Sequence, residues 1–327
     1  MQAFELLQPA DTHEALEMLA RYKDAAFIAG GTTLLDIMKC GLAAPPTLID
    51  ITALPLASIE ADHNRVRIGA LARNSDIAYD ARVQKQLPML AQAFLAGASP
   101  QLRNMATMGG NLLQRTRCTY FRDPAAACNK RAGGAGCDAF EGFHRMHALL
   151  GTSDACIATH ASDAAVALVA LDAVVEIEGP AGKRRVPLEH FYRTPGETPS
   201  IENDLAAGEL IAAVEIPHAP AQRHSTYLKV RDRASYEFAL TSAAAGLEFE
   251  GEIITSARLA LGGVATIPWR SRDAEEALVG KAPDEDVFRQ AAEIALGGAV
   301  PRRDNAFKVE LAKRTIVRAL QIVERGP

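Results

Sequence analysis

The sequence predicts an α/β fold that passes into an α+β fold, and three observations point to it. Strand-like and helix-like apolar segments alternate through roughly the first two-thirds of the chain. Three strand-like segments then follow one another, and three helix-like segments end the chain. A cluster of prolines at Pro195, Pro199, Pro217 and Pro220 marks the change near 200–222. With 327 residues, 48% of them hydrophobic, the chain is long enough for two or three domains.

The first region shows its elements one after another. Apolar residues recur at helical spacing over 12–22, and again in SDIAYDARVQKQLPMLAQAFLAGA, where Pro88 interrupts the helix because proline lacks an amide hydrogen. The other expected elements are an apolar strand that breaks at Gly30-Gly31 and continues as a helix, the strands TLIDIT and RVRIGALAR, a helix running into a strand over 163–179, and the strand and turn GKRRVPLEHFY.

The second region has a different texture. STYLKVRDR, FALTSAAAGLEF and TSARLALGGVA are three consecutive strand-like segments, which predicts an antiparallel meander. Helical spacing follows near 273–281, 284–297 and 307–325. A small sheet covered by helices is therefore expected at the C-terminal end.

Composition excludes some classes of function. A net charge of −5 and a pI near 5.9 argue against nucleic-acid binding. No segment approaches the ~18 apolar residues of a membrane span. The N-terminal residues lack the basic and apolar parts of a signal peptide, so this chain alone predicts a cytoplasmic protein. A signal on a partner could still export a folded complex to the periplasm.

Two glycine pairs stand in chemically suggestive settings. Gly30-Gly31 follows a strand and precedes two threonines, and Gly109-Gly110 precedes Asn111. Glycines allow a backbone to approach a phosphate closely, and successive N–H groups then form an anion-binding concavity. The GxGxxG pattern of a Rossmann dinucleotide site is absent. Each pair taken alone is also typical of a simple turn.

Seven blocks of sequence occur in an order typical of one protein family. They are AGGTTLLDIMK, LIDIT, RIGALAR, QLRNMATMGGNL, SDAAVALVALDAVVEI, YLKVRDRASYEFALTSAAA and LALGGVATIPWR. Over nearly its whole length the chain thus resembles the FAD-binding medium subunit of the molybdenum hydroxylases, which include xanthine dehydrogenases, aldehyde oxidoreductases and carbon monoxide dehydrogenases. The resemblance implies a vanillyl-alcohol-oxidase-like FAD-binding domain of two α/β subdomains over 1–215, with an insertion at about 112–162. A C-terminal α+β domain, as in carbon monoxide dehydrogenase flavoproteins, would cover 216–327.

The resemblance also implies which residues bind FAD. The two glycine loops would hold its pyrophosphate and ribityl chain, and no residue of this chain is expected to be catalytic. The implied contacts are Ile28, Ala29, Gly30, Gly31, Thr32, Thr33, Leu34, Thr107, Gly109, Gly110, Asn111 and Ile211.

Two more positions and one departure follow from the same resemblance. Asp163 would reach the flavin or its ribityl hydroxyls, and Lys229 would lie near the isoalloxazine, where a cation raises the flavin potential. From the residues alone, Asp163 could instead be a helix N-cap and Lys229 a solvated strand lysine. Gly97 stands where some family members carry an aromatic side chain against the flavin, which leaves the stacking partner open.

Four of the five cysteines lie close together in the insertion. Cys118, Cys128, Cys137 and Cys156 are separated by nine, eight and eighteen residues, whereas zinc ribbons use CxxC pairs. From spacing alone, an iron–sulfur cluster, a zinc site and two disulfides all remain open. Cys40 lies alone in a helical segment and is expected to be a small buried hydrophobe.

The family resemblance favours a 4Fe–4S cluster. The insertion is similar to that of aldehyde oxidoreductase flavin subunits of the periplasmic type, which bind such a cluster through cysteines. His144 and His147 share the insertion in an HxxH pattern but lack fitting ligand partners, so they are not expected to bind metal. The insertion is also basic, and its charges could balance the cluster or contact a subunit; these residues are Arg115, Arg117, Arg122, Lys130, Arg131 and Arg145.

The implied function is electron transfer within a heterotrimer. A large partner would carry the molybdenum cofactor and oxidise an aldehyde or N-heterocycle. A small partner would carry two 2Fe–2S clusters, and this chain would pass their electrons through FAD to an external acceptor, which no motif identifies. The alternatives are a stand-alone FAD-dependent oxidase or dehydrogenase of the same fold, and a zinc-stabilised binding module without redox activity.

Overall fold

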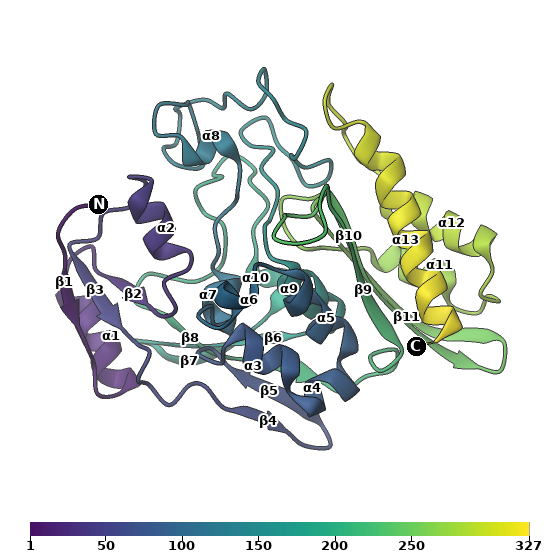
Figure 1. The fold of residues 1–327 in the computed structure, drawn as a ribbon, viewed down its shortest axis with the longest axis horizontal. Helices are drawn as coiled ribbons and strands as arrows, with labels where there is room; N and C mark the ends of the chain where they lie inside the picture. The colour runs from purple at the N-terminus through teal and green to yellow at the C-terminus, as the bar shows by residue number, and fades with distance from the viewer. Residues whose placement is uncertain (327) are drawn as a thin grey trace.

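The protein, described by a computed structural model over residues 1–326, contains three β-sheets with helices packed on and between them (Figure 1). The strands are β1 (Glu5–Leu7), β2 (Ala26–Ile28), β3 (Thr47–Asp50), β4 (Ile59–Ala61), β5 (Arg65–Gly69), β6 (Val174–Gly179), β7 (Gly182–Pro187), β8 (Leu210–Pro217), β9 (Ser225–Val230), β10 (Thr241–Glu250), β11 (Ile253–Gly262) and β12 (Trp269–Arg270). The helices are α1 (Thr12–Arg21), α2 (Leu34–Lys39), α3 (Asn74–Tyr79), α4 (Ala81–Gln86), α5 (Pro88–Ala96), α6 (Pro100–Arg103), α7 (Met108–Leu112), α8 (Thr119–Arg122), α9 (Asp163–Ala170), α10 (Leu188–Phe191), α11 (Arg272–Leu278), α12 (Glu285–Ala295) and α13 (Phe307–Arg325).

The N-terminal sheet is small and parallel, with the strand order β1-β3-β2. Helix α1 begins at an N-cap, because the Asp11 side chain accepts the Glu14 amide hydrogen at 2.9 Å. Its buried Ala15 belongs to the same core as Ile49 of β3. Strand β2 delivers the chain directly to the first glycine loop, which leads into α2.

The central sheet has five strands in the order β4-β5-β8-β6-β7, all antiparallel. Helices α3, α5 and α9 belong to its core, and seven of the eight residues of α9 are buried. Strand β8 was not expected from the sequence, although LIAAVEI is apolar apart from Glu215 and is buried along its whole length. It lay within the proline-rich region that suggested a boundary. The long helix expected around Pro88 is in fact three helices, α3, α4 and α5, and Pro88 is the first residue of α5.

The C-terminal sheet, ordered β12-β11-β10-β9, is the antiparallel meander expected from the sequence, extended by the short β12. Helix α13 packs on β9 and β10, while α5 and α9 also contact this sheet. Buried side chains of α11, α12 and α13 complete a second large core, which includes Leu278, Phe288 and Leu320. Figure 1 shows these three helices together at the edge of the molecule, beyond the sheet.

The segment between α7 and α9 is irregular apart from α8. In Figure 1 it lies between α2 on one side and β10 with α13 on the other. Its Leu149 amide donates to the Val264 carbonyl at 2.7 Å, and both Leu149 and Leu150 belong to the C-terminal core. The insertion is therefore joined to the C-terminal sheet by packing. Within residues 1–326, no helix is both long enough and apolar enough to cross a membrane.

Candidate functional site

The fold brings the two glycine loops into direct contact. A Cβ atom on Gly30 would lie 1.8 Å from the Met105 carbonyl oxygen, so only glycine allows the first loop to pack on the segment that precedes α7. Gly31 has a φ of +71°, which glycine adopts without strain. Two motifs distant in the sequence thus form one structural unit.

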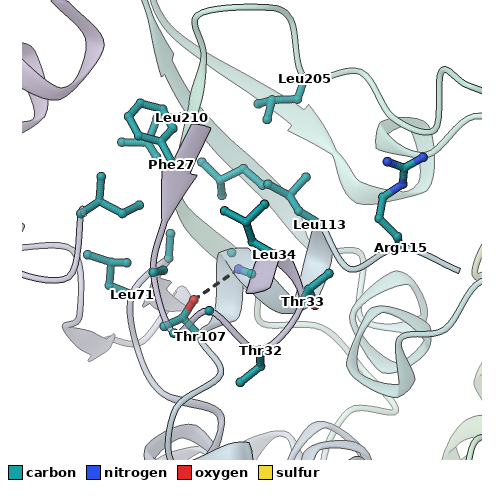
Figure 2. Close-up of a pocket in the computed structure, with 18 of the residues that line it drawn as sticks. Phe27, Thr32, Thr33, Leu34, Leu71, Thr107, Leu113, Arg115, Leu205 and Leu210 are labelled. Carbon is teal, nitrogen blue, oxygen red and sulfur yellow. Dashed lines mark hydrogen bonds between the residues drawn. The ribbon is translucent and has the colours of Figure 1, made fainter. Parts of the chain in front are cut away.

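This unit forms one wall of a cavity of about 230 Å³ (Figure 2). Leu34, Leu71 and Leu113 contribute apolar surface to it, and Arg115, labelled in Figure 2, and Glu209 are its charged lining residues. The expected FAD contacts that line the cavity are Ala29, Gly30, Gly31, Thr32, Thr33, Leu34, Thr107, Gly109, Gly110 and Ile211. Four residues of the expected set are not among its lining residues: Ile28, Asn111, Asp163 and Lys229.

Asn111 instead connects the second loop to helix α9. Thr107 caps α7 by accepting the Gly110 amide hydrogen at 3.3 Å (Figure 2). Asn111, on the same short helix, accepts a hydrogen bond at 2.5 Å from the hydroxyl of Ser162. Ser162 is the N-cap of α9, because its oxygen also accepts the Ala165 amide hydrogen at 2.9 Å. The interpretation of Asp163 as an N-cap is therefore wrong; Asp163 is the first residue of the helix itself.

Asp163 is the centre of a buried polar network. Its Oδ2 lies 2.8 Å from Lys229 Nζ, and its Oδ1 accepts the Tyr227 hydroxyl at 2.6 Å. The Tyr227 hydroxyl is also 2.9 Å from the Ser242 hydroxyl. Burial, followed by the Asp163 charge, raises the pKa of Tyr227 well above its usual range, so the phenol remains protonated. The side chain of Lys229 is only 3% exposed, which excludes the solvated-lysine interpretation.

Gly97 lies against the same carboxylate. A Cβ atom at this position would be 3.3 Å from Asp163 Oδ2, and Lys229 Nζ donates to the neighbouring Ala96 carbonyl at 3.2 Å. The backbone at 96–97 is therefore part of the wall around the Asp163 network. An aromatic side chain here would have to displace it or point elsewhere.

A second cavity, of about 220 Å³, contains the carboxylate end of this network. Asp163, Tyr227 and Ser242 line this cavity. Lys229 does not line it but pairs with Asp163 from behind the cavity wall. His160 also lines it; burial, and to a lesser degree Lys130, lowers the pKa of this imidazole to about 3. The remaining lining residues are Arg117, Cys118, Thr119, Phe143, Met146, His147, Thr159, Ala161, Ser162, Glu237, Phe238, Ala239, Gly262 and Gly263.

All four cysteines of the insertion line a third, small cavity of about 10 Å³. Cys118, Cys128, Cys137 and Cys156 carry free thiols, and no disulfide occurs in the described chain. Burial raises the pKa of Cys118 to about 11 and also raises the pKa values of Cys137 and Cys156. Thiolates at these positions therefore require positive charge beside them, which a metal centre supplies.

The cysteine cavity shares part of its lining with the second cavity. Cys118 and His147 line both the second and the third cavity, so the two cavities share a wall. His147 Nε2 is 3.1 Å from Cys118 Sγ. Among residues 1–326, no three His, Cys, Asp or Glu side chains are grouped closely enough to chelate a single metal ion.

Most basic residues of the insertion take part in ion pairs that fasten it to the rest of the fold. Arg117 and Arg122 both reach Asp36 of α2, at 2.7 and 2.8 Å. Arg115 and Lys130 both reach Glu202, at 2.7 and 2.9 Å. The remaining pair joins Arg145 to Asp232 at 2.7 Å, while Arg131 donates to backbone carbonyls.

Cys40 lies next to the first of these contacts. It is the C-cap of α2, half-buried, and the Arg122 guanidinium donates to its sulfur at 3.4 Å. The expectation of a buried cysteine is wrong, because Cys40 is only half-buried where α2 ends beside the insertion. It does not line the cysteine cavity.

Three residues of these sites were not assigned to them from the sequence: Tyr227, Arg115 and His160. Tyr227 precedes Lys229 by two positions, and the alternation of a strand could have placed both side chains on one face. Arg115 was grouped with the other basic residues, but it lines the first cavity. His160 follows Cys156 in the insertion and had no motif around it.

The first cavity has features that fit FAD. No side chain caps the N-terminus of α2, and Thr32 and Thr33 lie at that end, so amide hydrogens and hydroxyls are available to an anion. Gly30 and Gly110 both line the cavity, and Gly110 presents only backbone atoms to it, where the diphosphate of a dinucleotide would approach.

Comparisons with known proteins agree with this geometry. Residues 2–219 match the family model of the FAD binding domain in molybdopterin dehydrogenase, and residues 226–323 match that of the CO dehydrogenase flavoprotein C-terminal domain. The chain is 49% identical, over 98% of both chains, to the aldehyde oxidoreductase FAD-binding subunit PaoB of Escherichia coli. It is 28% identical to the carbon monoxide dehydrogenase medium chain of Hydrogenophaga pseudoflava, over 97% of this chain and 96% of that one.

A solved structure supports the same assignment. Quinoline 2-oxidoreductase from Pseudomonas putida includes a chain with a TM-score of 0.77 and 27% identity, covering 99% of this chain and 98% of that one. The resemblance inferred from the sequence and the expected fold class are both confirmed. The chain belongs to the FAD-binding subunits of the molybdenum hydroxylases, oxidoreductase subunits that work in multi-subunit complexes.

Proposed function

We propose that this chain is the FAD- and 4Fe–4S-containing electron-transfer subunit of a heterotrimeric molybdenum aldehyde oxidoreductase. A large partner would carry the molybdenum cofactor, and a small partner would carry two 2Fe–2S clusters. The observation that carries the cluster is the convergence of four thiols, from distant positions in an irregular segment, on one cavity. The likeness to an aldehyde oxidoreductase subunit along the whole chain supports the aldehyde as substrate.

The chemistry of the cysteine cavity supports an iron–sulfur centre. Cluster irons require thiolate ligands, and the four cysteines would supply one for each iron. Burial raises the pKa of Cys118, Cys137 and Cys156, so these thiols would lose their protons as the metal binds. Lys130 lines the same cavity and would add positive charge near the resulting anionic centre.

The FAD would extend from the first cavity toward the second. Thr32, Thr33 and the α7 loop would bind the diphosphate, and Arg115, which pairs with Glu202, would lie beside it. Asp163, oriented by Tyr227 and Lys229, would accept hydrogen bonds from the ribityl hydroxyls or the flavin. Bound FAD would supply the redox chemistry by accepting electrons and passing them on. The residues around it bind and orient it; none is required to move a proton.

The electron path would run through all three subunits. Oxidation of an aldehyde to a carboxylic acid with oxygen from water releases two electrons and two protons at the molybdenum subunit. The 2Fe–2S clusters of the small partner would deliver the electrons to this chain, and an external acceptor would remove them. The complex would share one compartment, so a signal on any partner would determine whether it is cytoplasmic or periplasmic.

We also keep the division inferred from the sequence, with an FAD-binding domain over 1–215 and a C-terminal domain over 216–327. The separate cores of the central sheet and the C-terminal sheet support this division. The insertion would connect the two domains, because its Leu149 packs in the C-terminal core and its Arg117 pairs with Asp36 of the N-terminal domain.

One experiment separates this proposal from its alternatives. The chain is produced with its partners and purified without oxygen, and FAD, iron, acid-labile sulfide and zinc are measured per chain. We expect one FAD and, after correction for the 2Fe–2S partner, four irons and four sulfides. Zinc in place of iron would leave a zinc-stabilised module. The chain is also purified without its partners, and oxidation of a substrate by that preparation would make it a stand-alone flavoenzyme.

A further inference from the structure

We propose that His147 donates a hydrogen bond to the sulfur of Cys118 and thereby raises the reduction potential of the cluster that the four cysteines would hold. The carrying observation is the 3.1 Å distance between His147 Nε2 and Cys118 Sγ, at the wall shared by the second and third cavities. This inference rests on the proposed cluster. It gives His147 a positioning role outside the set of ligands.

The direction of the hydrogen bond follows from the chemistry of the sulfur. A cysteine bound to iron is a thiolate, which has no proton to donate and can only accept. The proton of the contact must therefore belong to Nε2 of the imidazole. Among residues 1–326 no group bonds to Nδ1 of His147, so the contact at Nε2 alone determines the tautomer.

The position of His147 is fixed by the start of helix α13. The buried ammonium of Lys308 donates to the His147 carbonyl at 2.9 Å, and the Asn305 amide donates to the same oxygen at 3.3 Å. Lys308 and Asn305 are both fully buried, and His147 is itself only 5% exposed. The backbone that carries the imidazole is thus held beside Cys118 by the start of α13, a helix of the C-terminal core.

The expected effect has a definite sign. One-electron reduction of the cluster adds a negative charge that spreads onto its sulfur ligands, and no bond is formed or broken. A hydrogen bond to a ligand sulfur strengthens as that charge grows, so it stabilises the reduced state more than the oxidised state. Removing the donor therefore lowers the potential.

His144 provides a matched control for His147. It belongs to the same HxxH pair and is also buried, at 3% exposed. Its ring nitrogen lies 3.5 Å from Asp304 instead of a cysteine, and His144 does not line the cysteine cavity. Replacing either ring by phenylalanine removes a buried imidazole, but only one replacement removes a contact to sulfur.

The test measures the cluster potential in the purified three-subunit complex. Wild-type, His147→Phe, His147→Gln and His144→Phe complexes are titrated reductively, and the 4Fe–4S signal is followed by electron paramagnetic resonance. We expect His147→Phe to reduce the equilibrium constant for cluster reduction about tenfold, a fall of about 59 mV for one electron. His147→Gln, which keeps an N–H donor, should recover part of the shift, and His144→Phe should match the wild type. FAD content reports on folding in every variant.

The outcomes separate this inference from the function on which it rests. A wild-type complex without 4Fe–4S iron would overturn the proposed cluster. Iron in all complexes with equal potentials for wild type and His147→Phe would overturn the inference and leave the proposed function standing. If His147→Phe does not assemble, wild-type and His144→Phe complexes labelled with ¹⁵N-histidine are compared after reduction. A histidine nitrogen coupled to the cluster in both supports the hydrogen bond, and its absence in both refutes it.

Discussion

Lys229 Nζ lies 2.8 Å from Asp163 Oδ2, so the lysine expected beside the flavin is already part of a buried ion pair. The two side chains are 3% and 11% exposed, and Tyr227 holds the other carboxylate oxygen. Asp163 lines the second cavity, whereas Lys229 contacts it only through this pair. The lysine therefore acts on the cavity by neutralising a carboxylate that faces it.

The first prediction concerns the flavin potential. Lys229→Met should leave FAD bound but lower its midpoint potential by about 30 mV or more, a tenfold change for two electrons. The variant removes a positive charge and leaves the Asp163 carboxylate unbalanced where reduction places negative charge. Redox titration followed by visible absorbance measures the shift. Arg231→Met is the control, because Arg231 also donates to the Ala96 carbonyl but does not pair with Asp163. Equal potentials in wild type and Lys229→Met would contradict the role.

The second prediction concerns the second glycine loop. Gly110→Val should abolish FAD retention, because Gly110 lines the first cavity and its Cβ would already lie 3.1 Å from Thr107 Oγ1. The branched side chain would both fill the cavity and disturb the cap of α7. Cofactor released by acid is measured against protein. Gly133→Val is the control, since no atom lies within 4 Å of a Cβ built there. Stoichiometric FAD in Gly110→Val would show that the loop does not bind the cofactor.

Much of the fold was predictable because many of its elements follow from the spacing of apolar residues close together in the sequence. The strands and helices around the first sheet, the meander and the three C-terminal helices follow from apolar runs, alternation and helical spacing, whereas the parallel pairing of the first sheet was not predicted. Strand β8 was missed because LIAAVEI, buried on both faces, has no alternation and adjoins prolines that suggest a boundary. Its role as the strand between β5 and β6 depends on pairing with distant segments, which no local pattern encodes.

The candidate site divides in the same way. The glycine loops and the cysteines were recognisable because particular residue types are required at particular positions. The Asn111–Ser162 hydrogen bond and the Tyr227–Asp163 hydrogen bond could not be recognised in the sequence. Each joins two residues that lie more than fifty positions apart in the chain. Contacts of this kind arise from tertiary packing, and no local pattern in a single sequence predicts them.

The third prediction concerns the cysteines. Cys128→Ser should lose iron, sulfide and the broad absorbance near ~400 nm of a protein-bound iron–sulfur centre. Binding of such a centre is coupled to folding of its loop, so the insertion should become protease-sensitive between residues 115 and 150. Some FAD should remain, because the two glycine loops lie outside the insertion. Cys40→Ser, which changes a cysteine outside the cavity, should keep its iron. Full iron content in Cys128→Ser would remove this residue from the ligand set.

The last prediction uses the buried lysine at the start of α13. Burial, with a smaller contribution from Arg145, lowers the pKa of Lys308 from 10.5 to about 7. Between these values the unfolded chain holds more protons than the folded chain, so the free energy of unfolding should rise with pH. The stabilisation from this group is complete above pH 10.5, diminishes as the pH falls, and is lost once the pH passes below about 7, where both states are protonated.

Lys308→Met removes this dependence, although it also leaves the His147 and Gly263 carbonyls without their donor. That second effect is independent of pH, so the two can be separated by measuring urea unfolding at several pH values above neutrality. We expect the wild-type free energy of unfolding to gain roughly 1 kcal/mol per pH unit relative to Lys308→Met. Lys313→Met, on the same helix but paired with Glu293 at 2.5 Å, should run parallel to the wild type. Parallel curves for wild type and Lys308→Met would instead mean that Lys308 keeps its ordinary pKa in the folded chain.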